Sequence, residues 1–121
     1  MWNEGSRTFT AAADLEGRRR VKLKSGTTTT PPEVVYAGAG EDYIGITEYA
    51  VKSGEPVAIR LKNDSGTFEV ECHIKTAIAV GTGLYGAADG RVTDDNASGS
   101  VQMIALQAAG ASNEHIECLP A

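Results

Sequence analysis

Three groups of residues have the types and spacing that catalysis or ligand binding would require. The segment 81–86, Gly-Thr-Gly-Leu-Tyr-Gly, matches the G-x-G-x-x-G pattern of a dinucleotide-binding loop. Such a loop must end a strand and open a helix, whose N-terminus holds the pyrophosphate. Here Ala-Ala-Asp-Gly follows at once, and a helix is not expected to run through that turn. We therefore interpret the match as chance.

Acidic side chains form the other two groups. Residues 89–96 include three aspartates and an asparagine, but they lack the alternating donors, central glycine and terminal glutamate of a calcium loop. Glu69 and Glu71 share the outward face of a predicted strand, as the paired carboxylates of a glycoside hydrolase might. No aromatic residues gather near them to bind a sugar, so neither group predicts a site.

The two cysteines are expected to have a structural role, and not a catalytic or metal-binding one. The chain has two cysteines, Cys72 and Cys118, two histidines and no Cys-x-x-Cys pair, so it has no recognisable zinc ligands. Neither cysteine has an evident base to activate it. Both fall on inward positions of predicted strands, which favours buried free thiols and leaves a disulfide open. We expect no enzyme activity, no cofactor and no metal.

Short segments of alternating apolar and polar residues, separated by glycine-rich turns, dominate the chain and are clearest from Tyr43 to Ile74. This pattern is typical of half-buried antiparallel strands. Segments 57–62 and 67–75 are predicted to pair as a hairpin, with Arg60 and Lys62 facing Glu69 or Glu71. The dipeptide Asp-Gly at 89–90 predicts a second hairpin. Further strands are expected at 20–24, 33–37, 43–47, 101–106 and 115–119.

The length of 121 residues suits one domain. Residues 1–19 show no clean period and are predicted to form an N-terminal arm, followed by a single β-rich domain over 20–121. The expected fold is mainly β, a small antiparallel β-sandwich or a partly open β-barrel with an extended N-terminal arm. A weak repeat at an offset of 57 residues, pairing Ile46 with Met103 and Ile59 with Ile116, suggests two similar β-turn-β units.

The net charge and the hydropathy of the chain limit the classes of partner that it is expected to bind. The net charge of −5 argues against general affinity for nucleic acid. The one basic run, Arg18–Arg20 with Lys22 and Lys24, is either a solvated face or a local contact for an acidic partner. No apolar stretch approaches the roughly 20 residues that span a bilayer, and no signal segment opens the chain, so neither a membrane nor secretion is expected. Trp2 and Phe9, two of few aromatics, are expected to dock either on the chain's own core or on a neighbouring subunit.

The order of several segments gives a family resemblance. They are Phe9–Leu15, Arg20–Lys24, Tyr43–Thr47, Gly54–Val57, Gly66–Val70, Val80–Tyr85 with Asp89–Thr93, and Ala105–Ala109 with His115–Cys118. This succession resembles that of tailed-bacteriophage capsid decoration proteins, also called head-stabilising or cement proteins.

The resemblance implies a non-enzymatic virion protein, made in the bacterial host cytoplasm, that binds the major capsid protein on the outer capsid surface and stabilises the expanded shell. It also implies a homotrimer, with a monomer or dimer left open, and an arm that reaches across capsid subunits. The candidate capsid contacts are Trp2, Phe9, Leu15, Arg18, Arg19 and Arg20. The alternative is a phage or bacterial surface adhesin module for glycan or protein, with a groove lined by Tyr36, Tyr43, Tyr49 or Tyr85.

Overall fold

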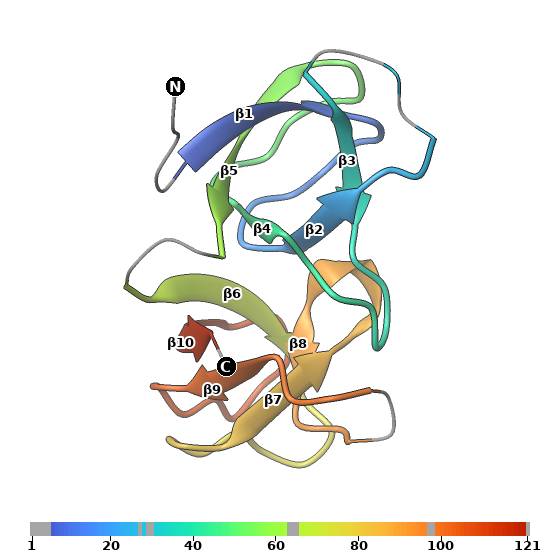
Figure 1. Cartoon of the computed structure of the whole chain (residues 1–121). Coiled ribbons are helices and arrows are strands. Elements are labelled where there is room, and N and C mark those ends of the chain that lie inside the picture. The colour runs from blue at the N-terminus through green and yellow to red at the C-terminus, as the bar shows by residue number, and fades with distance from the viewer. Residues whose placement is uncertain (1–5, 27, 29–30, 63–65, 97–98, 121) are drawn as a thin grey trace.

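Two small β-barrels, stacked one on the other, make up the computed structural model of this protein (Figure 1). The structure describes residues 6–26, 28, 31–62, 66–96 and 99–120. The first barrel has the strand order β1-β3-β2-β4-β5, and the second has β10-β6-β8-β7-β9. The strands are β1 (Ser6–Ala11), β2 (Arg20–Leu23), β3 (Glu33–Tyr36), β4 (Gly45–Thr47), β5 (Pro56–Leu61), β6 (Phe68–His73), β7 (Gly83–Gly86), β8 (Val92–Thr93), β9 (Met103–Ala105) and β10 (His115–Pro120), with a turn of 3-10 helix, η1 (Ala88–Gly90), between β7 and β8.

The two barrels share one topology, in which β1 to β5 correspond in order to β6 to β10. The pairs β1–β3 and β6–β8 are parallel, and the other pairs in each barrel are antiparallel. The weak sequence repeat therefore identified equivalent strands, β4 and β5 with β9 and β10. Its register was wrong, because Ile46 points out of its barrel, as Ile104 does, whereas Met103 points inward.

Period-two alternation places the core. In β6 the inward residues Phe68, Val70 and Cys72 are buried, and in β10 Ile116 and Cys118 are buried. The expectation of a mainly β fold with buried free thiols is confirmed. Burial raises the pKa of the Cys118 thiol to about 12 and also raises the pKa of Cys72.

One predicted hairpin is wrong and the other is confirmed. β5 pairs with β1 and β4, whereas β6 pairs with β10 and β8, so these two strands belong to different barrels. Lys62 binds Asp42 at 2.9 Å instead of a glutamate of β6. Alternation fixes which face of a strand is buried but does not name its partner. The second hairpin forms between β7 and β8, with positive φ at both Asp89 and Gly90 as its tight turn requires.

The predicted arm over residues 1–19 is corrected from residue 6 onward. β1 lies between β5 and β3 and closes the first barrel. Phe9 and Leu15 are 3% and 2% exposed and pack in the core of that barrel, so neither offers a surface to a capsid. The chemical reason is that β1 carries one large apolar residue, Phe9, among polar residues and one alanine, which leaves little alternation to read. Trp2 lies outside the described residues.

Phe9→Ala tests this placement. Removing a buried phenylalanine leaves a cavity, and the expected loss in the free energy of unfolding is about 3–5 kcal/mol. Thr8→Ala, at the exposed neighbouring position, is the matched control and should change it by about 0.5 kcal/mol or less. Urea denaturation measures both values. If both variants lose equally little unfolding free energy, Phe9 is not buried in the barrel and belongs to an N-terminal arm.

The Cys118 thiol predicts a loss of stability in alkali. Its pKa is about 12 in the folded chain against 9.0 for a free thiol, so its contribution is complete below pH 9 and is lost as the pH rises toward 12. Between pH 9 and 10 the wild type should lose more unfolding free energy than Cys118→Ala. Above pH 10 the shifted pKa values of Tyr43 and Arg20 also contribute. Equal slopes for the two proteins between pH 9 and 10 would contradict this assignment.

Candidate functional site

The junction between the two barrels gathers the basic run Arg18–Arg20. Arg20, at the start of β2, is 0% exposed. Its guanidinium donates hydrogen bonds to the second barrel and to the loop after β3, which together surround it. The acceptors are the carbonyl oxygens of Arg91 (3.0 Å), Ala87 (2.8 Å), Glu41 (3.0 Å), Ala37 (3.2 Å) and Gly38 (3.2 Å), and Oε1 of Gln102 (2.9 Å).

Arg19 makes a second set of bonds across the same junction. Its Nη2 lies 2.8 Å from Oε2 of Glu71 on β6, and its Nη1 donates to the carbonyl of Asp89 at 2.9 Å. The backbone repeats the connection, because the amide of Glu71 donates to the carbonyl of Arg18 at 2.8 Å. Arg19 and Arg20 therefore join the barrels and are buried, so neither side chain is presented at the surface of the chain. Arg18 remains half-buried.

Burial and the neighbouring ionisable groups have opposite effects on the pKa of Arg20. Removal from water lowers the pKa of Arg20 to about 10, although the charges of Glu41 and Asp42 favour its protonated form. Tyr43 packs beside it, with the guanidinium 6.0 Å from the ring centre, and burial raises the pKa of Tyr43 to about 12. Arg20 thus stays charged at neutral pH, and its charge is solvated by carbonyl dipoles in place of water.

Two glycines allow the close approach. A Cβ at Gly86 would lie 2.8 Å from Nη2 of Arg20, and one at Gly90 would lie 2.5 Å from the Arg20 carbonyl oxygen. β7 and its turn can therefore lie against Arg20 only without side chains at these positions. Gly86 is the last glycine of the G-x-G-x-x-G match, and strand β7 runs through the second half of that segment.

The other acidic candidates have structural partners. Glu71 binds Arg19 and lies 3.3 Å from Nε2 of His115. Partial burial alone would raise the pKa of Asp94, but its carboxylate accepts bonds from the amides of Lys75, Thr76 and Ala77, which hold that pKa below its usual range. Across the described part of the chain, no three His, Cys, Asp or Glu side chains cluster as metal ligands would. Within the same residues no helix has the length and apolar character to cross a membrane.

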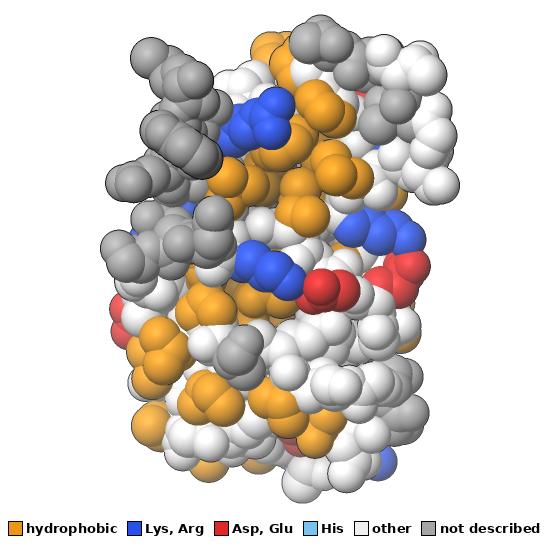
Figure 2. All heavy atoms as spheres, in the orientation of Figure 1, with side chains coloured by type: hydrophobic (Ala, Val, Ile, Leu, Met, Phe, Trp, Pro, Cys, Tyr) orange, Lys and Arg blue, Asp and Glu red, His pale blue; other side chains and the backbone are white. Residues whose placement is uncertain are grey.

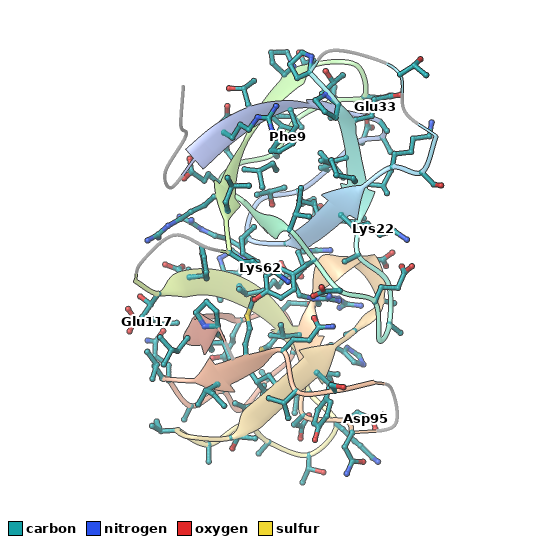
Figure 3. The ribbon with its side chains drawn as sticks, in the orientation of Figure 1. Phe9, Lys22, Glu33, Lys62, Asp95 and Glu117 are labelled. Carbon is teal, nitrogen blue, oxygen red and sulfur yellow. The ribbon has the colours of Figure 1, made fainter. Side chains whose placement is uncertain are left out.

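Two of the tyrosines line separate grooves on the described surface. Tyr36 lines a groove of about 570 Å³ with Asp14, Arg19 and Lys52. Tyr43 lines another, of about 540 Å³, at the junction of the barrels, where Figure 3 shows Lys62. Each of these two grooves is lined by one of the tyrosines that the adhesin alternative names, and that alternative stays a prediction.

An exposed apolar strip covers the outer face of the second barrel. Gly83 of β7 pairs with Ile104 of β9, which pairs with Leu119 of β10, so the three lie in one row. Val101 sits over Gly83, since a Cβ there would be 3.1 Å from its side chain. We call Gly83, Val101, Ile104, Leu106 and Leu119 the apolar strip. Figure 2 shows hydrophobic side chains gathered over this part of the lower barrel.

The strip was missed at the sequence level, although a signal for it exists. Leu119 and Ile104 occupy outward positions of strands whose inward positions are also apolar. An apolar residue at an outward position departs from the usual pattern of a half-buried strand. Leu119 is 44% exposed and Val101 is 40% exposed, so the departure marks a surface that the single chain leaves open.

Arg20→Met tests the junction. Replacing the guanidinium leaves several buried carbonyls without donors, and we expect a loss of about 3 kcal/mol or more in unfolding free energy, because each unsatisfied buried acceptor costs about 1–3 kcal/mol. Lys22→Met is the matched control on the same strand, because Lys22 forms only a partly exposed pair with Glu41, worth about 1 kcal/mol or less. Urea denaturation compares the two variants. A loss no larger for Arg20→Met than for Lys22→Met would contradict the role given to Arg20.

Comparison with known proteins bears on this architecture as a whole. No curated protein matches the chain by sequence. The N base of the head fibre gp8.5 in bacteriophage phi29, known from a crystal structure, has the same fold, with a TM-score of 0.75 and 18% sequence identity over 96% of this chain and 92% of that chain. A family model described as phage cement protein matches residues 4–119, which include both barrels and the junction. The chain therefore belongs to the phage cement protein family, and it is a structural protein of the phage head.

Proposed function

We propose that this protein binds the outer surface of a phage capsid through the major capsid protein and stabilises the expanded shell without catalysing a reaction. The observation that carries the proposal is the family match over residues 4–119. The match includes both barrels, and we take the whole two-barrel body as the unit that binds.

The mechanism is thermodynamic linkage. A protein that binds the expanded shell, and not the unexpanded one, stabilises the expanded state by its binding free energy. At a free concentration about 100 times Kd, each site contributes about 2.7 kcal/mol. Many copies on one shell add these contributions, so a modest affinity per copy is enough. The net charge of −5 favours the outside of the shell, away from the phosphates of packaged DNA.

The capsid contacts are proposed from the residues that remain available. Phe9, Leu15 and Arg20 belong to the interior of the chain. Trp2 stays a proposed contact, and half-buried Arg18 is a second one. We further propose that the protein acts as a homotrimer on the outer capsid surface, after synthesis in the host cytoplasm, with a monomer or a dimer as the other outcomes of the oligomer measurement.

Co-sedimentation with phage heads tests the proposal. Purified protein is mixed with expanded and with unexpanded heads, and the bound fraction is followed by a heat challenge that measures the temperature of head rupture. We expect saturable binding to expanded heads only and a higher rupture temperature, because only that state gains binding free energy. Binding to neither form, or binding without a change in rupture temperature, would contradict a cementing role.

A variant pair separates the contacts from the fold in the same assay. Trp2→Ala should weaken binding to expanded heads severalfold, since buried tryptophans often dominate interfaces. Thr8→Ala, on the exposed side of β1, is the control and should bind as the wild type does. If Trp2→Ala binds as the wild type does while binding itself is real, Trp2 is not a contact, and the cementing proposal still holds.

A further inference from the structure

We propose that the apolar strip on the second barrel is the surface by which one copy of this chain binds a second copy. This inference deepens the oligomer named under the proposed function and rests on that part of it alone. It assigns the contact to β7, β9 and β10, far from the strands of the first barrel that hold the buried N-terminal residues.

The first observation is that the strip is continuous across three strands. Gly83, Ile104 and Leu119 are register partners in neighbouring strands. Val101 covers the glycine, and Leu106 follows β9 with its amide bonded to the carbonyl of Glu117. Val101, Leu106 and Leu119 are each at least 37% exposed. Single exposed apolar residues are ordinary, whereas a contiguous group marks a contact surface.

The second observation is that the equivalent face of the first barrel is covered. There the corresponding row is Arg20 of β2, Ile46 of β4 and Arg60 of β5. Ile46 is 2% exposed and packs into the core cluster of the second barrel, and Arg60 lies over the Phe68 ring at 5.0 Å. The same face of the same topology therefore has a barrel packed on it in one case and, among the residues that the structure describes, no barrel packed on it in the other.

Figure 1 makes the relation visible. β2 and β4 of the upper barrel face the lower barrel, and their counterparts β7 and β9 lie in the lower barrel, with the Gly86 end of β7 against Arg20 at the junction. The residue types differ accordingly. The covered row uses arginines that bond to the loops of the second barrel, and the open row uses glycine, isoleucine and leucine. An apolar row cannot make such bonds and instead suits contact with a similar apolar surface.

Charge is the third observation, and it limits where a second copy can bind. The chain carries a net charge of −5, so two copies repel one another over most of their surface. None of the five strip residues is charged, and strip-to-strip contact brings no carboxylate against another. Charged side chains begin next to the strip at Glu117, which pairs with Glu69 on the neighbouring strand. A charge-free centre with a charged rim is the usual anatomy of a protein interface.

The strip also continues into the junction between the barrels. Val101 lines the groove of about 540 Å³ together with Tyr43, Gln102 and Pro120. A second copy seated on the strip thus has an adjoining hollow for its rim residues, which enlarges the contact toward the roughly 800 Å² per partner of a stable interface.

Sedimentation equilibrium of the purified full chain, without any phage heads, tests this proposal. The wild type should self-associate, and Leu119→Glu should weaken the association about 10-fold or more, because it places a charge in the centre of an apolar contact. Leu23→Glu is the matched control, since Leu23 is 47% exposed against 44% for Leu119 but lies on the first barrel. It should associate as the wild type does. Leu119→Ser, which adds no charge, should show a smaller effect in the same direction and serves if the glutamate variant does not fold.

The outcomes separate this inference from the proposed function. A wild type that stays monomeric at every concentration, or equal association of Leu119→Glu and the wild type, overturns the strip as a self-contact even where shell binding is intact. A Leu119→Glu variant that keeps its association but no longer binds expanded heads also overturns it, and assigns the strip to the shell. Loss of association in Leu119→Glu alone supports it, whether or not the wild type binds heads.

Discussion

The buried charge of Arg20 is the constraint on which the arrangement of the two barrels depends. A guanidinium removed from water costs several kcal/mol unless its donors are satisfied, and here carbonyls from both barrels satisfy them. Each acceptor must therefore be in its place before the cation can be buried. This requirement links the loop after β3, the turn between β7 and β8, and the side chain of Gln102 into one geometry. The barrels cannot tilt or slide relative to each other without leaving a charge unsolvated, so the junction specifies one arrangement.

The duplicated topology shows how two equivalent faces acquired different uses. In each barrel one row of register partners on three neighbouring strands points outward. This row is arginine, isoleucine and arginine in the first barrel, and glycine, isoleucine and leucine in the second. The middle isoleucine is common to both. The flanking residues decide whether the face bonds to polar loops or stays apolar, so the fold constrains the middle position and the neighbouring surface constrains the flanks.

The sequence allowed local structure to be predicted, but it did not allow the pairing of strands far apart in the chain to be predicted. Alternation gave the inward positions of Phe68, Val70 and Cys72 correctly because burial repeats every two residues. The Asp89–Gly90 turn was likewise readable, because positive φ restricts residue type. The partners of β5 and β6 were not readable, since many strands share the same pattern and a turn between two strands need not pair them. Arg20 was also unreadable as a buried residue, because a basic run is ordinarily exposed, and only the carbonyls of distant loops make its burial possible.

A rigid junction matters for the proposed cementing role, because a body that reinforces a shell must not yield within itself. If the barrels moved freely, binding at one of them would leave the other without effect on the shell, and the free energy of contact would not be transmitted. The proposed association between copies would work in the same direction. Once one copy of a linked pair is bound, the second binds from a local concentration set by the linkage and not by the solution, which raises avidity without any new contact to the shell. Rigidity within the chain is a condition for this gain, because avidity is lost where the geometry prevents both copies from binding at once.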